Sequence, residues 1–255
     1  VVVRNGTVRF WGGSGINLSS NGDGHMIENV VAIENGITGI NAGRESLVTG
    51  CIANSNGASG IFANRESIVS GCNAAKNAFN GITVNQGGRV VDSVASVNGV
   101  NGIEMRNGFV SGCVVRENGD IGIVVRDGVV ESCTVIDNVG NGISTTSSSA
   151  FNITQRGVIR NNYVEGNGIA GNDAGIFVST QNTTIEGNTL IANAFGIRVT
   201  RANGNNLVIA DRAFENTSNY FIVAGNPLGP IVPIASQSNL SSVINADHPQ
   251  ANFSR

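Results

Sequence analysis

The sequence repeats a unit of 20 or 21 residues, with a few insertions, from its first residues to about Gly225. The dipeptide Gly-Ile recurs along the chain, and an asparagine stands five residues before most of its isoleucines. The isoleucines are Ile16, Ile40, Ile61, Ile82, Ile103, Ile123, Ile143, Ile176 and Ile197. The asparagine column consists of Asn35, Asn56, Asn77, Asn98, Asn118, Asn138, Asn167, Asn193 and Asn216. A period of this length is typical of a solenoid, in which each unit forms one coil and stacks on the coil before it.

Each unit also alternates in the manner of short β-strands. A β-branched residue stands eight positions before each asparagine, as Val110 does before Asn118, and a small or aliphatic residue stands three positions before it. Only 13% of the residues are charged and leucine is scarce, which argues against surface helices and against leucine-rich repeats. The sequence therefore predicts an all-β, single-domain parallel β-helix of about ten coils. We expect the asparagines to form an internal hydrogen-bonded ladder.

The unit V-x-G-C-x-V-x-x-N-x-x-x-G-I, written once from Val110 to Ile123, resembles the repeats of a known superfamily. This is the pectate-lyase-like superfamily of right-handed parallel β-helix proteins, which includes pectinases, alginate epimerases and phage tailspikes. The closing stretch NYFIVAGNPLGPIV…HPQANFS resembles the tails of uncharacterised bacterial β-helix proteins. The resemblance implies right-handed coils over residues 1–225. All four prolines lie after residue 226, so residues 226–255 are expected to leave the coil as an extended capping tail.

Four cysteines share one column of the repeat, five residues before a ladder asparagine: Cys51, Cys72, Cys113 and Cys133. The same column holds Val30, Ser93, Asn162 and Asn188 in other coils, which favours a small inward slot filled by buried thiols. Stacking also brings the cysteines close in pairs, so disulfides stay open as an alternative. No histidine lies near them and the ligands would stand in a line, so we expect no metal site and no cofactor.

Arginines recur near one edge of the repeat. Arg44 and Arg65 occupy equivalent turn positions in the phrases RESLVTGC and RESIVSGC. The proposed ligand-binding stripe consists of Arg44, Arg65, Arg89, Arg106 and Arg126. Such a stripe could bind the carboxylates or sulfates of an acidic polysaccharide. The alternative is a charge ladder neutralised by the neighbouring carboxylates Glu45, Glu66 and Asp127.

Catalytic signals are weak. Glu131, Arg160 and Glu186 fall in one column, which fits either an acid–base pair or a ladder of salt bridges, and Glu104 is a third candidate carboxylate. Two insertions, residues 145–157 and 168–174, could wall a groove beside them. The aspartate clusters and Gly-His-Gly of polygalacturonases and the Asp-Pro-His of alginate epimerases are absent.

These observations favour a polysaccharide-binding β-helix without catalysis. The first alternative is a polysaccharide lyase, epimerase or hydrolase with an atypical site. The second is a structural segment of a surface or phage-tail protein. Whether the chain is an enzyme is left open at this point.

The net charge of −3 argues against a nucleic-acid partner, and no apolar run is long enough to span a bilayer. The chain begins with VVVRNGTVRF, which reads as the middle of a strand. We therefore expect a natural N-terminus with a secretion signal to precede it, and a secreted or cell-surface protein. An outward column predicts self-association, because contiguous exposed apolar residues usually meet a partner. It consists of Val31, Ile52, Asn73, Val94, Val114, Thr134 and Tyr163.

Overall fold

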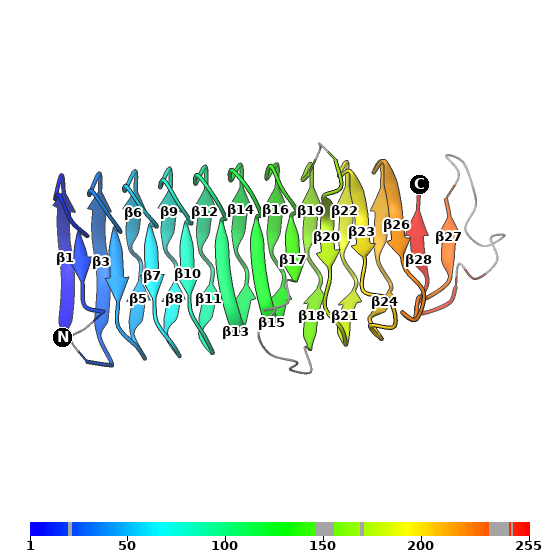
Figure 1. Cartoon of the computed structure of the whole chain (residues 1–255), viewed down its shortest axis with the longest axis horizontal. Helices are drawn as coiled ribbons and strands as arrows, with labels where there is room; N and C mark the ends of the chain where they lie inside the picture. Colours follow the sequence, from blue (N-terminus) through cyan, green and yellow to red (C-terminus); the bar gives the residue numbers. More distant parts are fainter. Residues whose placement is uncertain (20–21, 146–155, 169–170, 235–244, 246) are drawn as a thin grey trace.

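The computed structural model of the chain describes residues 1–19, 22–145, 156–168, 171–234, 245 and 247–255. These residues form 28 strands and no helix, and every pairing between strands is parallel. The strands wind into a β-solenoid of about 11 turns, close to the ten coils expected (Figure 1). The predicted all-β fold, a parallel β-helix, is therefore confirmed. The described part of the chain contains no helix that could cross a membrane.

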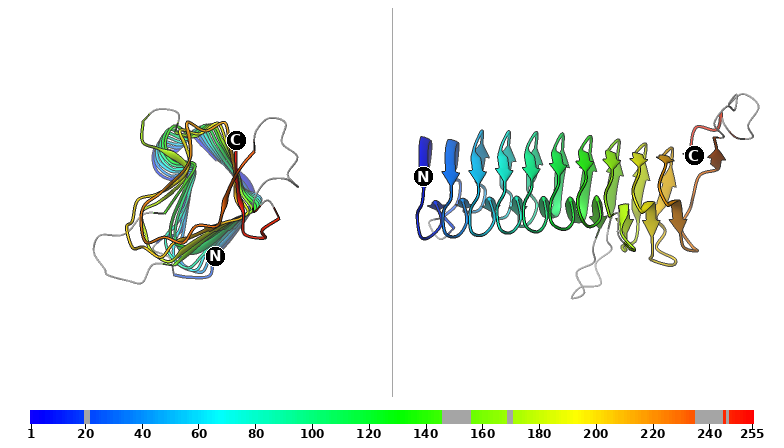
Figure 2. Two further views of the ribbon diagram at one scale, coloured as in Figure 1. Left: turned by 90° about the vertical axis from the view of Figure 1, so that its right-hand side faces the viewer. Right: turned by 90° about the horizontal axis from the view of Figure 1, so that it is seen from above.

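Each coil has three faces, which give the solenoid a three-sided outline when it is viewed along its axis (Figure 2). Face A contains β5 (Leu47–Thr49), β8 (Ile68–Ser70), β11 (Arg89–Val91), β18 (Gly157–Arg160), β21 (Thr183–Glu186) and β24 (Leu207–Ile209). Face B contains β6 (Ile52–Asn54), β9 (Asn73–Ala75), β12 (Val94–Ser96), β14 (Val114–Arg116), β16 (Thr134–Ile136), β19 (Tyr163–Glu165), β22 (Thr189–Ile191), β25 (Arg212–Phe214) and β28 (Asn252–Ser254). Face C contains β2 (Ile16–Asn17), β4 (Ile40–Ala42), β7 (Ile61–Ala63), β10 (Ile82–Val84), β17 (Ile143–Thr145), β20 (Ala174–Val178), β23 (Phe195–Val199) and β26 (Ser218–Ile222).

Four longer strands bend around a corner and belong to two faces. β1 (Val2–Arg9) and β3 (Met26–Ile33) join face A to face B, whereas β13 (Ile103–Ser111) and β15 (Ile123–Glu131) join face C to the next face A. In the tail, β27 (Ile231–Pro233) pairs with β28, and β28 also pairs with β25 of the last coil. The tail therefore adds two parallel strands beyond β25, first β28 and then β27.

The corners contain backbone in the left-handed region, and at the corner between faces A and B most of the residues tolerate it. At the corner between faces A and B, Gly50 has φ 59° and Gly112 has φ 63°, and Asn29 and Asp92 take the same conformation in other coils. Glycine has no Cβ to clash there, and the left-handed conformation costs asparagine and aspartate less free energy than it costs other residues. This requirement accounts for the glycines and asparagines at this corner, whereas residues such as Glu34, Lys76 and Val97 take the same conformation at the corner between faces B and C.

The core is built from stacked identical columns. Face C contributes the isoleucines of the Gly-Ile dipeptides, and those from Ile40 to Ile197 are fully buried. Face A contributes β-branched residues such as Val69 and Val90, and face B contributes mostly alanines such as Ala53 and Ala74, also fully buried. Neighbouring strands lie about 4.8 Å apart, so each side chain packs on its own counterpart in the next coil. The repeat of the sequence is thus a repeat of packing.

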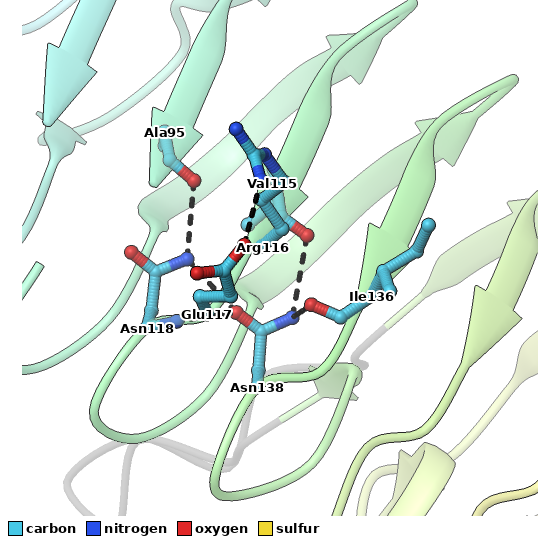
Figure 3. A network of polar contacts seen from close by, with 7 residues as sticks. All are labelled: Ala95, Val115, Arg116, Glu117, Asn118, Ile136 and Asn138. Atoms are coloured by element: carbon cyan, nitrogen blue, oxygen red, sulfur yellow. Dashed lines mark hydrogen bonds and ion pairs between the residues drawn. The ribbon is translucent and has the colours of Figure 1, made fainter. Parts of the chain in front are cut away.

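The asparagine ladder runs inside the corner between faces B and C and is confirmed in detail. In the section shown in Figure 3, Asn118 Nδ2 donates to the Ala95 carbonyl at 3.1 Å and to Asn138 Oδ1 at 2.8 Å. Asn138 Oδ1 also accepts the Asn118 backbone N–H at 3.1 Å. Each of these side chains therefore satisfies a carbonyl and an N–H of the preceding coil, which would otherwise be costly to bury.

The cysteine column fills the corner between faces A and B. All four cysteines are free and buried, and each donates its thiol to carbonyls, as Cys51 Sγ does to the Thr49 carbonyl at 3.3 Å. The expectation of buried thiols is confirmed, and the disulfide alternative is not found. In the C-terminal coils the same slot carries a second polar ladder, which consists of Asn162, Asn188, Asp211 and Asn252.

Candidate functional site

The arginine stripe lies at the corner between faces C and A, but its members do not form one unbroken column. Backbone pairing places Arg44, Arg65, Arg106 and Arg126 in register, with Gln86 between Arg65 and Arg106. The prediction of five stacked arginines was therefore wrong for one member. Arg89 belongs to a different column on face A, where it pairs with Ile68 and Phe109.

The alternative of a neutralised stripe is not supported by the ion pairs of the described residues. Among these residues only Arg126 of the stripe forms an ion pair, at 3.6 Å from Glu104. Glu45, Glu66 and Asp127 instead sit in left-handed turn positions with φ of 51°, 59° and 58°. They lie beside the arginines along the chain without meeting them, so the corner has a mixed charge with several arginines left to solvent.

A groove opens on this corner in the middle of the solenoid. It has a volume of about 530 Å³, and it is lined by Gly87, Gly88, Arg89, Asn107, Gly108, Phe109, Asp127 and Gly128. Gly88, Gly108 and Gly128 occupy a slot that holds Ser46 and Ser67 in earlier coils and Thr183 and Asn206 in later ones. Without side chains at this slot, the groove has a floor of backbone that a ligand can approach closely.

The glycines follow from the packing beneath them. A Cβ on Gly108 would collide with the Met105 side chain, and a Cβ on Gly88 would collide with Val84. In the earlier coils the inward residue on face C is an alanine, as at Ala63, and the corner has room for Ser67. In these coils the larger inward residues fill the space that a corner side chain would need, whereas the later coils combine the inward Val178 and Val199 with Thr183 and Asn206 at the corner.

The groove is lined by two charged side chains, Arg89 and Asp127, and by the aromatic ring of Phe109. The Arg89 guanidinium lies over the Phe109 ring, with Cζ 4.8 Å from the ring centroid, and its side chain is exposed. This cation–π contact holds the guanidinium in place without neutralising it. Burial raises the pKa of the Asp127 carboxyl, and a hydrogen bond from the Arg156 backbone partly opposes that rise.

The three candidate catalytic carboxylates are not brought together. Glu131 accepts from Arg160 Nε at 2.7 Å, whereas the ion pairs of the described residues include none between Arg160 and Glu186. Glu104 lies on face C, where it accepts from Asn80 Nδ2 at 2.9 Å and pairs with Arg126. None of the three lines the groove. Within the described residues, no group of three or more His, Cys, Asp or Glu side chains could hold a metal ion.

Sequence reasoning missed the groove and a second pair of carboxylates. Asp120 and Asp173 lie at the outer edge of face C, two coils apart; Asp173 accepts from Asn141 Nδ2 at 3.0 Å. Burial, and then the charge of Asp173, raise the pKa of Asp120.

The glycines at 88, 108 and 128 were visible as a column with a 20-residue spacing and could have signalled the groove. The two insertions expected to wall a groove lie largely or partly outside the described residues. These are residues 146–155 of the insertion at 145–157 and residues 169–170 of the insertion at 168–174.

Comparisons with known proteins agree with the architecture. Among solved structures, the A-module of a mannuronan C-5 epimerase from Azotobacter vinelandii matches at 15% identity and a TM-score of 0.61, covering 82% of this chain and 65% of that one. The Dettilon tailspike protein matches at 17% identity and a TM-score of 0.65, covering 100% and 59%. The tailspike of the E. coli bacteriophage HK620, solved in complex with a pentasaccharide, matches at 14% identity and a TM-score of 0.51, covering 88% and 51%. The chain thus spans less than two thirds of the length of each.

No curated protein sequence matches. The family model for the right-handed β-helix region matches residues 1–156, and the chain therefore belongs to the right-handed β-helix family.

Proposed function

We propose that this protein binds an acidic polysaccharide in the groove at the corner between faces C and A, without transforming it. The observation that carries the proposal is the groove itself, with a glycine floor and with Arg89 held over Phe109 at its side. Arg106 precedes the groove residue Asn107 and is exposed. A shallow, open groove of this kind suits an extended polymer more than a small molecule, which usually binds in an enclosed pocket.

The charge of the groove favours an anionic sugar. A guanidinium presents planar donors that match a carboxylate or a sulfate, and neither Arg89 nor Arg106 forms an ion pair with a described residue. Asp127 adds one negative charge to the same groove, so the net attraction is small. We therefore expect weak binding that is sensitive to salt.

Structures with this fold act on polysaccharides or bind oligosaccharides according to their names, as in the epimerase module and the tailspike complex. This supports a carbohydrate ligand for the present chain. Binding without catalysis is favoured because Glu104 and Glu131 are engaged in ion pairs and do not line the groove. The groove has one carboxyl, Asp127, whereas glycosidases ordinarily use two.

The test is affinity electrophoresis through polygalacturonate, alginate or a sulfated polymer. Replacing Arg89 and Arg106 with alanine should weaken binding by about 3- to 10-fold at low salt, because each exposed ion pair contributes roughly 0.2–1 kcal/mol. The matched control is Arg116→Ala with Arg212→Ala, which removes the same charge from exposed positions on face B. The effect should shrink as salt rises. Equal losses in the two double variants would show that net charge alone matters and would refute the groove.

Incubation of the purified chain with the same polymers tests the enzyme alternative. A lyase would release unsaturated ends that absorb in the ultraviolet, and a hydrolase would release reducing ends. We expect neither product. If product appears, the variants Glu131→Gln and Glu186→Gln decide whether those carboxylates act, and the non-catalytic proposal fails.

A further inference from the structure

A cluster of aromatic rings surrounds one arginine on the outer side of face C, near the C-terminal end of the solenoid. Phe177, Arg198 and Phe221 occupy the same outward column in three successive coils. The Arg198 Cζ atom lies 5.7 Å from the ring centroids of both phenylalanines and 5.2 Å from that of Phe195. Phe195 and Phe221 meet edge to face, with centroids 5.9 Å apart. We call these four residues the Arg198 platform.

The platform is ordered by its own contacts. Arg198 Nη1 donates to the Asn172 carbonyl, and the rings hold the guanidinium from both neighbouring coils. Such stacking fixes a long side chain that would otherwise lose conformational freedom on binding a ligand. Phe221 is 43% exposed, so the platform presents apolar surface to solvent next to a fixed positive charge.

The same column is mostly different elsewhere on face C. It holds Asn17, Asn41 and Thr83 in earlier coils, with only Phe62 as an aromatic exception. Packing of the core does not explain the change, because these side chains point away from it. Arg198 forms no ion pair with a described carboxylate, so no carboxylate among the described residues neutralises its charge.

We infer that the Arg198 platform is a second binding position for an acidic polysaccharide, and that it takes one uronic-acid ring. A pyranose ring has an apolar C–H face that matches a phenylalanine ring, and the carboxylate of a uronic acid matches the guanidinium. This inference rests on the proposed function and names the sugar class. The platform begins three coils after Arg106, or about 14 Å along the axis at the spacing of parallel strands, on the face that borders the groove. This axial spacing is shorter than the length of a linear polymer of a few sugar rings.

The experiment compares binding to polygalacturonate and to neutral dextran. The variant Phe177→Leu with Phe221→Leu keeps the apolar volume and removes the ring faces, and Arg198→Gln removes the charge. Each should weaken binding to polygalacturonate by about 3- to 10-fold, as expected for the loss of one or two aromatic or charged contacts. The matched control is Phe10→Leu with Phe79→Leu, which changes two rings that are 65% and 56% exposed away from the platform.

The outcomes separate the platform from the groove. If the Arg89 and Arg106 variant loses binding and the platform variants match the control, the platform is overturned and the proposed function stands. If only the platform variants lose binding, the platform stands and the groove is overturned. If the wild-type chain is not retarded by polygalacturonate, both fail. A platform change that alters self-association in light scattering and leaves polymer binding unchanged would overturn the assignment to sugar. Melting temperatures equal to the wild-type value exclude misfolding as the cause.

Discussion

Asp211 is a carboxylic acid in a slot built for asparagine. It is fully buried in the ladder between faces A and B, where its Oδ1 accepts the backbone N–H and the side-chain amide of Asn188 at 2.8 and 2.9 Å. The other atom, Oδ2, has no hydrogen-bond partner. Burial raises the pKa of Asp211 from 3.8 to about 7, despite the two bonds from Asn188, which lower it.

The ladder shows what Oδ2 lacks. Every asparagine in this slot uses its Nδ2 to donate to a carbonyl three residues before its partner in the preceding coil. Asn188 donates to Ile159 at 3.0 Å and Asn252 donates to Val208 at 3.2 Å. By the same rule Oδ2 of Asp211 faces the Ile185 carbonyl, where only a donor is favourable. A protonated carboxyl supplies that donor and an ionised carboxylate does not.

Replacing Asp211 with asparagine should therefore stabilise the protein near neutral pH. The folded pKa lies about 3 above the unfolded value, and each pKa unit corresponds to roughly 1.36 kcal/mol, so the upper limit of the gain is about 4 kcal/mol. The sign follows from proton binding. Below about pH 4 both states hold the proton and the penalty is absent, whereas between pH 4 and 7 only the folded state holds it and stability falls as pH rises. Above pH 7 the penalty is constant.

The assay is urea unfolding of the wild-type chain and the Asp211→Asn variant from pH 4 to 8.5, with hydrogen exchange at residues 206–216 as a local measure. The difference in the free energy of unfolding should be small at pH 4 and should rise to a plateau above pH 7. Glu186 also raises the pKa of Asp211, so a Glu186→Gln background separates its charge from burial. A difference that does not change with pH, or a variant less stable at pH 8, would refute the reasoning.

Three other predictions test the core and the outer surface. The four cysteines are at most 2% exposed, so the native protein should react slowly with a thiol reagent and the denatured protein should titrate four thiols, although a hydrogen bond from Cys72 lowers the pKa of Cys51; fast labelling of two in the folded state would contradict this. The outward column of face B, with Ile52 38% and Val114 36% exposed, should support self-association, and a strict monomer in light scattering would exclude it. Gly108→Ser should destabilise the fold by about 1–3 kcal/mol through overpacking against Met105 and the Gly88 carbonyl, and Met105→Ala should relieve part of that cost in the double variant. Strictly additive losses would contradict the packing argument.

The sequence allowed the interior to be predicted because every coil repeats one environment. Asn118 has the same neighbours as Asn98, so the period alone placed both in a ladder. The position of Arg89 follows from the same count, which the grouping of the five arginines overlooked. Arg44, Arg65, Arg106 and Arg126 each stand 12 residues before a ladder asparagine, as Gln86 does, whereas Arg89 stands nine residues before Asn98. Strand pairing showed that Gln86, rather than Arg89, is in register with Arg106.

Two further features escaped prediction for physical reasons. Asn252 continues the ladder 41 residues after Asp211, and this long separation hides its place in the period. The Arg198 platform lies on outward positions, where a side chain meets solvent and no neighbour dictates its identity. Residues there vary from coil to coil, so no column reveals them.

The groove lies where one internal ladder is interrupted. At the corner between faces C and A, Ser67 Oγ accepts from the Ser46 N–H at 3.1 Å, and Asn206 Oδ1 accepts from the Thr183 N–H at 2.8 Å. Between these pairs the slot contains only glycine and makes no such bonds. In these consecutive coils the slot offers no side-chain oxygen to accept the backbone N–H of the preceding coil. Such departures from a repeat concentrate at functional sites. The larger Val84, Met105 and Val125 compensate by packing beneath the glycines, which lets this corner open to a ligand while the core stays closed.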